Sequence, residues 1–89
     1  MARVGATVKV MPDGPKRDLQ ALRKSLASKV PVAIQLQGFR EEPVAFGLRA
    51  LIASVTLEDA EGGTDALEEA WSRIEGVQSV QVLEVSRLQ

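Results

Sequence analysis

Hydrophobic and polar residues alternate strictly at the start of the chain. In residues 2–11, Val4 and Val8 share one face, whereas Arg3 and Lys9 lie on the other. Alternation with a period of two, carried by β-branched residues, is typical of a half-buried strand. The run "PDGP" then ends the pattern, because proline and glycine interrupt regular structure. We therefore predict a first strand over residues 2–11.

The apolar spacing changes to a helical period after this turn. Leu19, Leu22 and Leu26 recur at intervals that place them on one side of a helix. Pro15 suits the first helical position, and the residue before Pro31 is pushed out of the helical region. The basic residues of this segment lie mostly off the apolar stripe and are interpreted as a solvated face: Lys16, Arg17, Arg23 and Lys24.

Two more alternating segments follow, and they differ in how much they should be buried. Residues 32–37 alternate apolar and polar positions, which predicts a second strand. Residues 48–59 carry apolar side chains at almost every position, with Ala50 and Ile52 on one face and Val55 and Leu57 on the other. A strand that is apolar on both faces is usually central and covered on both sides.

A second helix and a fourth strand complete the pattern. In residues 61–76, Leu67, Trp71 and Ile74 form the apolar stripe, and we interpret Trp71 as a core residue. Either Thr64 or Asp65 can cap this helix, and Asp65 with Glu68 has the spacing of a capping box. Gly76 suits the end of the helix. Residues 77–88 form the last strand, whose alternation slips at Val82 and Leu83, so a β-bulge is predicted there.

The resulting order βαββαβ predicts an α+β fold. Right-handed crossovers and antiparallel neighbours give a ferredoxin-like sandwich with sheet order 4-1-3-2 and both helices on one face. The length fits one domain over residues 1–89. The other sheet face should still carry apolar side chains from the third strand, which would make it a partner surface.

The residue types that are missing exclude several kinds of chemistry. The chain has no Cys, no His and no Tyr, so it lacks thiolate sites and the commonest general base. The formal net charge of −1 is unlike that of nucleic-acid-binding domains, which are usually basic. Neither a signal peptide nor a long apolar run is seen. We expect a soluble cytoplasmic protein that contacts neither nucleic acid nor membrane.

Other site types lack their spacing or their residues. "EGGTD" is not a phosphate loop, because the required lysine is absent. The chain has no Asn for acylphosphatase chemistry, and its central strands carry no aromatic residues on which RNA bases could stack. One acidic cluster lacks the calcium-loop pattern and is interpreted as a solvated turn: Glu58, Asp59, Glu61 and Asp65. No cofactor and no metal site is predicted.

Several sequence blocks, in order, resemble one known family. They are "KVMP" (9–12), "EPVAFGLRAL" (42–51), "EGGTD" (61–65), "GVQSV" (76–80) and the closing "RL" (87–88). Together they are similar to the archaeal elongation factor 1-beta family and to the exchange domain of its eukaryotic counterpart. The resemblance covers the whole chain. It implies a guanine nucleotide exchange factor that acts on elongation factor 1-alpha, in its GDP-bound and nucleotide-free forms.

The resemblance also implies roles for particular residues. In the family, the aromatic residue of the "FG" turn docks in a pocket of the GTPase, and here that position is Phe46. A basic residue before the final leucine is inserted near the magnesium site, and here it is Arg87, where the eukaryotic pattern has lysine. Gly47 and Arg49 beside the aromatic, and Leu88 beside the base, complete the predicted partner-binding set.

Exchange requires no bond-making step, so an enzyme is not expected. Two other interpretations stay open on the sequence. One is a small-molecule-binding regulatory domain with the same sandwich, which would bury its open face in a homodimer. The other is an interaction module without exchange activity. The exchange-factor interpretation predicts a monomer or only a weak dimer.

Overall fold

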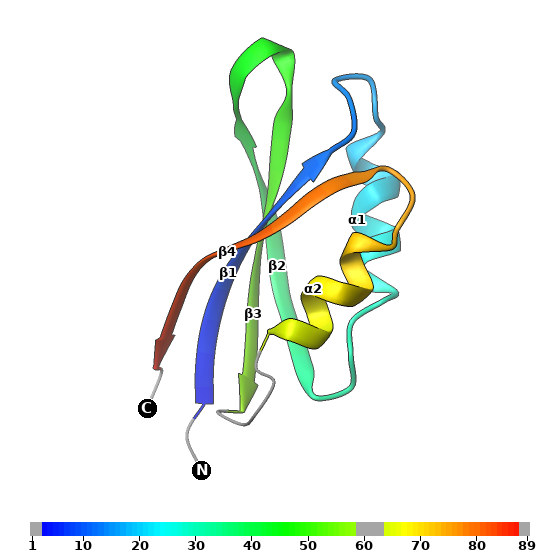
Figure 1. Cartoon of the computed structure of the whole chain (residues 1–89). Coiled ribbons are helices and arrows are strands. Elements are labelled where there is room, and N and C mark those ends of the chain that lie inside the picture. The colour runs from blue at the N-terminus through cyan, green and yellow to red at the C-terminus, as the bar shows by residue number, and fades with distance from the viewer. Residues whose placement is uncertain (1–2, 59–63, 88–89) are drawn as a thin grey trace.

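The computed structural model describes residues 3–58 and 64–87. Four strands, two α-helices and one short 3₁₀ turn follow one another in the predicted βαββαβ order (Figure 1). Their bounds are β1 Arg3–Pro12, α1 Leu19–Ala27, β2 Ile34–Pro43, η1 Ala45–Gly47, β3 Arg49–Glu58, α2 Asp65–Ser72 and β4 Val77–Arg87. Within these ranges, neither helix has the length and apolar character that crossing a bilayer requires.

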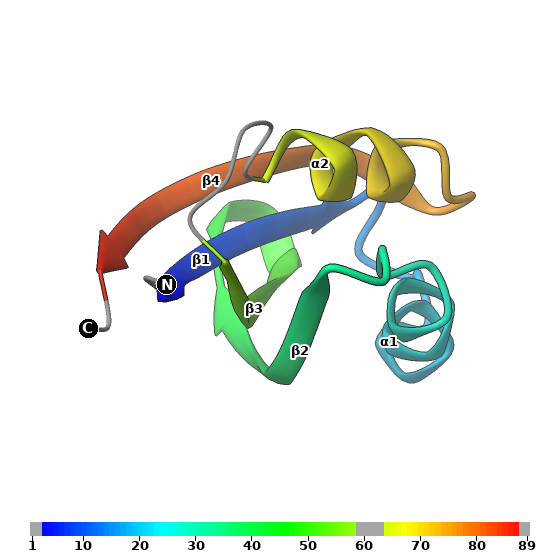
Figure 2. The same cartoon turned by 90° about the horizontal axis from the view of Figure 1, so that it is seen from below.

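The four strands form one antiparallel sheet in the order β2-β3-β1-β4. Read from the other edge, this is the predicted order 4-1-3-2. Both helices lie on the same side of the strongly twisted sheet (Figure 2). The ferredoxin-like arrangement is thereby confirmed. The β2–β3 hairpin projects beyond the rest of the sheet, as the top of Figure 1 shows.

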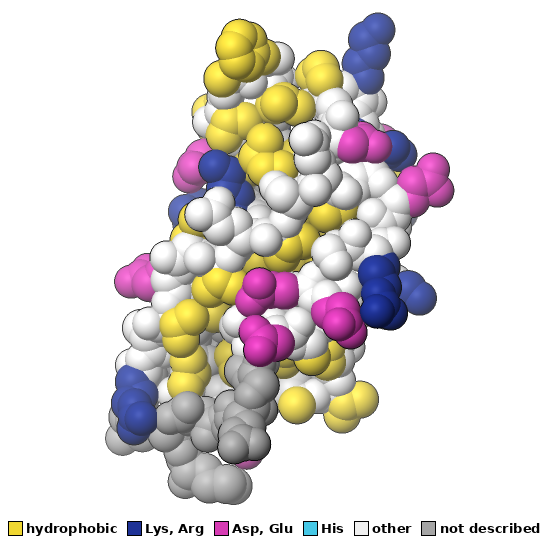
Figure 3. All heavy atoms as spheres, viewed as in Figure 1, with side chains coloured by type: hydrophobic (Ala, Val, Ile, Leu, Met, Phe, Trp, Pro, Cys, Tyr) yellow, Lys and Arg dark blue, Asp and Glu magenta, His cyan; other side chains and the backbone are white. Residues whose placement is uncertain are grey.

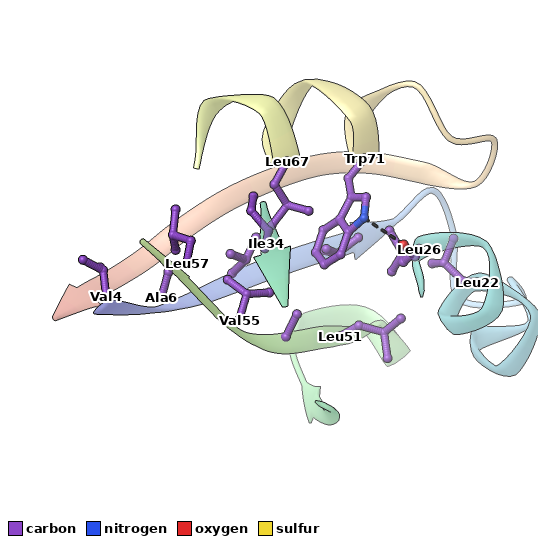
Figure 4. Packing of buried hydrophobic residues seen from close by; sticks show 13 residues of the cluster. Val4, Ala6, Leu22, Leu26, Ile34, Leu51, Val55, Leu57, Leu67 and Trp71 are labelled. Carbon is purple, nitrogen blue, oxygen red and sulfur yellow. Dashed lines mark hydrogen bonds between the residues drawn. The ribbon is translucent and has the colours of Figure 1, made fainter. Parts of the chain in front are cut away.

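The core lies between the helices and one face of the sheet. The alternate residues Val4, Val8 and Val10 of β1 are buried, as the alternation predicts. Trp71 of α2 is fully buried, and its Nε1 donates a hydrogen bond of 3.0 Å to the carbonyl oxygen of Leu26 in α1 (Figure 4). A buried indole N–H requires such a partner. The bond ties the two helices together, and Trp71 is confirmed as a core residue.

Three predicted element bounds are wrong. Helix α1 does not begin at Pro15, because Asp18 caps it and its carboxylate accepts from the amides of Gln20 and Ala21. Strand β2 continues to Pro43 rather than ending near residue 37, since a register shift between Leu36 and Gly38 lets pairing with β3 resume. Helix α2 ends at Ser72, before the predicted bound at residue 76.

The structure decides between the two N-cap candidates of α2, Thr64 and Asp65. Thr64 rather than Asp65 holds the N-cap position, and Thr64 Oγ1 donates to Glu68 Oε1 at 3.1 Å. Gly76 does not directly follow the helix and takes a φ of 100° in the turn that leads into β4. That positive φ explains the glycine at this position.

The prediction of an exposed apolar sheet face is wrong. Ala50 and Ile52 point away from the helices, yet only 0% and 1% of their surfaces are exposed. Ile52 lies between Lys9 of β1 and Arg40 of β2 in the register. Long basic side chains cover apolar neighbours with their aliphatic stems. The open face therefore offers less apolar surface than the sequence pattern indicated.

Candidate functional site

The tip of the β2–β3 hairpin is a compact turn fixed by backbone hydrogen bonds. The amide of Val44 donates to the Leu48 carbonyl at 2.9 Å, and the amide of Leu48 donates to the Ala45 carbonyl at 3.2 Å. Phe46 and Gly47 lie between these bonds. Their φ angles are 61° and 76°, so two successive residues adopt the left-handed conformation.

Phe46 is strained and exposed at the same time. A bulky residue with φ 61° and ψ 35° is unusual, because its Cβ crowds the following carbonyl. Its side chain is 94% exposed, so packing within the chain does not compensate for the strain. Non-glycine residues held in this region cluster at binding and switch sites. Docking in a partner's pocket, which the resemblance implies for Phe46, requires such exposure, and hydrophobic side chains gather at this tip, at the top of Figure 3.

Arg49 begins β3 directly beyond the turn. Its Nη1 donates to Glu41 Oε1 at 3.2 Å, so the guanidinium is held at the base of the tip. Gly47, between Phe46 and Arg49 in sequence, has open space where a Cβ would project. The structure thus brings together three of the predicted partner-binding residues: Phe46, Gly47 and Arg49.

The end of β4 forms a second exposed area, distant from the tip. Arg87 is exposed and pairs with Val4, whereas Leu88 lies outside the described residues. Val85 pairs with Ala6 and is 57% exposed, and Leu83 is 47% exposed. Strand β4 is an edge strand, and its apolar side chains form a strip at the lower left of Figure 3.

The predicted β-bulge determines which side chains form this area. Thr7 pairs with Glu84 and Val8 pairs with Val82, so Leu83 is an extra residue in β4. The bulge shifts the alternation by one position. As a result, Arg87 and Val82 both lie on the helix-side face of the sheet. Without the bulge, two residues five positions apart would lie on opposite faces.

The sheet register separates the two areas. Arg87 pairs with Val4, which pairs with Leu57 on β3, and Leu57 lies eight residues along that strand from Arg49. At about 3.3 Å per residue, this corresponds to roughly 26 Å, with the Phe46 turn farther still. The longest dimension of the molecule is 42 Å. Phe46 and Arg87 therefore do not share one pocket.

The described residues hold no group of side chains that could bind a metal ion. Within residues 3–58 and 64–87, no three His, Cys, Asp or Glu side chains are close enough to hold a metal ion. Of the predicted acidic cluster, Asp59 and Glu61 lie outside the described residues. The pKa of Asp13 is lowered, chiefly by hydrogen bonds from Arg17. This pair belongs to the β1–α1 loop and stabilises that loop.

The sequence patterns missed two features of the tip. The first is the left-handed conformation of Phe46, for which only the neighbouring glycine gave a signal. The second is Arg23, which was assigned to a solvated helix face but donates to Glu41 at 3.4 Å across to β2. This contact between residues far apart in sequence follows from the packing of α1 on the sheet. The spacing of residues within one segment cannot predict it.

Comparison with known proteins gives consistent results over nearly the whole chain. The profile of the EF-1 guanine nucleotide exchange domain matches residues 5–88. A protein of Methanocella arvoryzae named elongation factor 1-beta is 50% identical over 82 residues, which cover 92% of each chain. A protein of the same name from Methanothermobacter thermautotrophicus is 50% identical over 88 residues, covering 99% of both chains. The Methanosarcina mazei protein is 45% identical over 89 residues.

A solved structure with the same fold is more distant in sequence. The C-terminal domain of the MgtC protein from Mycobacterium tuberculosis superposes with a TM-score of 0.56 at 16% identity. The match covers 97% of this chain and 87% of that domain. At this identity the likeness concerns the fold alone.

Proposed function

Because the chain belongs to the family of EF-1 guanine nucleotide exchange domains, we propose that it promotes GDP release from elongation factor 1-alpha during translation elongation. It would act in the cytoplasm, where elongation takes place. Exchange makes and breaks no covalent bond, so the absence of His, Cys and Tyr is no obstacle. We therefore propose a binding protein that changes the affinity of its partner for nucleotide, and not an enzyme.

The conformation of Phe46 is the observation that carries this proposal. The turn holds the ring almost fully exposed on a left-handed backbone, at a cost that folding alone does not explain. Burying a phenylalanine is worth roughly 1.5–3 kcal/mol, and anchors at interface centres are often aromatic. Phe46 is thus suited to enter a pocket of the GTPase, and the backbone hydrogen bonds of the turn limit the conformational freedom that is lost on docking.

Arg87 is proposed to act at the nucleotide site itself. GDP is held in GTPases through its phosphates, magnesium and surrounding loops. A cation brought close to the magnesium site would repel the metal and weaken that network. Arginine is always charged, but its planar guanidinium is less compact than the lysine ammonium of the eukaryotic pattern. The exposed Leu83 and Val85 nearby would exclude water from this contact.

The energetics follow from reciprocity between two ligands of one protein. Suppose that the factor binds the nucleotide-free GTPase more tightly than the GDP complex. The factor must then lower the affinity of the GTPase for GDP by the same ratio. Two separated contact areas suit this arrangement. One can anchor the complex while the other perturbs the nucleotide site.

The direct test is the release of a fluorescent GDP analogue from elongation factor 1-alpha of the same organism. Adding the chain should accelerate release in proportion to its concentration until the GTPase is saturated. The chain alone should bind neither GDP nor GTP. Unchanged release at saturating concentrations would refute the proposed function.

Size-exclusion chromatography coupled to light scattering distinguishes the regulatory-domain alternative. We expect the mass of a monomer for an exchange factor. A stable homodimer that binds a small molecule at its seam would instead favour the regulatory domain. Exchange activity also separates the proposal from a simple interaction module.

A further inference from the structure

Glu41 of β2 lies between two arginines that come from different elements. Arg23 of α1 donates from Nη2 to Glu41 Oε2 at 3.4 Å, and Arg49 of β3 donates from Nη1 to Oε1 at 3.2 Å. Each carboxylate oxygen has its own donor. One side chain therefore connects the first helix to both strands of the hairpin that carries the Phe46 turn.

The sheet register explains why these three side chains meet. Glu41 pairs with Leu51, which is buried in the core on the helix side of the sheet. Arg49 lies two positions from Leu51 on the same strand, so it projects to the same side. Arg49 also pairs with Pro43, and this pair is the last before the turn. The Glu41–Arg49 contact thus lies at the base of the tip.

Arg49 has room to move apart from this contact. A hollow of about 120 Å³ lies between it and the β1–α1 loop, lined also by Gly47 and Leu19. Its side chain is 63% exposed. A long side chain in such surroundings has several accessible rotamers. The hydrogen bond to Glu41 is the feature that selects the observed one.

The ion pairs of Glu41 contribute little to the stability of the fold, because their side chains are partly exposed. The Nε of Arg23 is buried and has no hydrogen-bond partner within the described part of the chain. An unpaired buried donor destabilises the folded state, and partly exposed ion pairs contribute little. A methionine of similar length would cover the same apolar surface without that cost. The Arg23–Glu41 contact is therefore expected to add little to the free energy of unfolding.

We propose that Glu41 is a positioning residue for docking on the GTPase. It orients the Arg49 guanidinium at the base of the Phe46 turn and, through Arg23, fixes the β2–β3 hairpin against α1. A hairpin that is already fixed loses less conformational entropy on binding, which increases the affinity without any new contact. This inference rests on the proposed function for its partner, but the fixing of the hairpin is a property of the chain by itself.

Two substitutions test the proposal by exchange kinetics. Glu41→Gln keeps the shape but leaves one acceptor oxygen for two arginines, and Arg23→Met removes the link to α1. Each should raise the concentration for half-maximal GDP release about threefold, the size of one partly exposed ion pair, and leave the maximal rate unchanged. Arg23→Met should melt no lower than wild type, which a merely structural role would not predict.

Glu42→Gln is the matched control. Glu42 is adjacent on β2, points to the opposite face and lies 3.9 Å from Arg40 in its own ion pair. The charge change is identical, so the half-maximal concentration should remain at the wild-type value. An equal defect in Glu42→Gln would overturn the proposal, because the effect would then be one of net charge. Wild-type kinetics in both Glu41→Gln and Arg23→Met would also overturn it.

A measurement without the partner separates this inference from the proposed function. In the isolated chain, Glu41→Gln should lower the NMR order parameters of the amides of Ala45 and Gly47, and Glu42→Gln should not. Unchanged order at the tip would refute the fixing of the hairpin, whatever the exchange assay gives. If wild type released no GDP, the proposed function would fail, and the order parameters would still decide whether Glu41 fixes the tip.

Discussion

Phe46 and Arg87 lie at opposite ends of the sheet, one on the β2–β3 turn and the other at the end of edge strand β4. Figure 1 shows the turn at the top and the end of β4 at the bottom. Along the strands, roughly 26 Å already separates Arg87 from Arg49, and the Phe46 turn lies beyond Arg49. Two contacts this far apart can make independent contributions to one complex, and contributions of distant sites are nearly additive.

Substitutions at the two positions should therefore differ in their kinetic effects. Phe46→Ala should raise the factor concentration for half-maximal GDP release at least several-fold, because an anchor is lost. Arg87→Ala should lower the maximal release rate, because the magnesium region is no longer perturbed. Excess magnesium should then inhibit wild type more than Arg87→Ala. A titration of release rate at several magnesium concentrations measures all three effects, and identical defects in both variants would contradict the division of roles.

The strain at the turn predicts an unusual stability result. Glycine adopts a positive φ without the steric cost that Phe46 bears, roughly 1 kcal/mol or more. Phe46→Gly should raise the melting temperature by a few degrees and yet bind the GTPase as poorly as Phe46→Ala. Gly47→Ala should lower the melting temperature by a similar amount, because alanine is strained at a φ of 76°. The added Cβ meets no other atom, so backbone strain is the only cost. Calorimetric melting of the three variants gives the comparison.

The opposite order of stability would change the interpretation of Phe46. If both Phe46→Gly and Phe46→Ala melted well below wild type, the ring would have to be part of the folded core. Because the Phe46 side chain is 94% exposed, we expect neither substitution to lower the melting temperature strongly. Binding measured at a temperature well below all melting points keeps the two effects separate.

The sequence predicted the fold because each local signal agreed with the global arrangement. Val4 and Val8 alternate into the core, and the apolar stripe with Trp71 faces the sheet. The slip at Val82 and Leu83 also predicted the bulge that orients Arg87. These features depend on near neighbours in sequence, and periodicity records them.

The errors lie where distant residues decide the outcome. Strand β2 continues past Gly38 because it pairs with β3, although the apolar–polar alternation of β2 is broken there. Ile52 is buried on the open face because it pairs with Lys9 of β1 and Arg40 of β2. The Arg23–Glu41 contact joins a helix to a strand edge. Residue patterns within one segment cannot contain this information.

A side chain at Gly76 is disfavoured by the backbone conformation and, to a smaller extent, by the Arg17 side chain, which would have to shift. The φ of Gly76 is 100°, and an added Cβ would lie 2.9 Å from Arg17 Nε. Gly76→Ala should therefore destabilise the chain by about 2 kcal/mol, which lowers the melting temperature by roughly 10 °C. Gly38→Ala is the control, because its Cβ meets no atom and its φ is not in the left-handed region. An equal loss in Gly38→Ala would contradict the stated cause.

The Asp13–Arg17 contact predicts a pH effect of defined sign. Arg17 donates to both Asp13 oxygens, at 3.0 and 2.7 Å, and these hydrogen bonds lower the pKa of Asp13 from its ordinary value of 3.8. A lowered folded-state pKa contributes stability that is fully present above the ordinary value and is lost as the pH falls through the folded-state value. The contribution is modest, because both side chains are partly exposed.

Melting temperatures of wild type and Asp13→Asn, measured from about pH 6 down to about pH 2, check this effect. The advantage of wild type should be constant in the upper part of the range and should shrink below the ordinary carboxyl pKa. In an Arg17→Met background the same Asp13→Asn change should give no such pH-dependent difference, because the donor that lowers the pKa is gone. A wild-type advantage that grows on acidification would contradict the assignment, since it would require a raised pKa for Asp13 in the folded state.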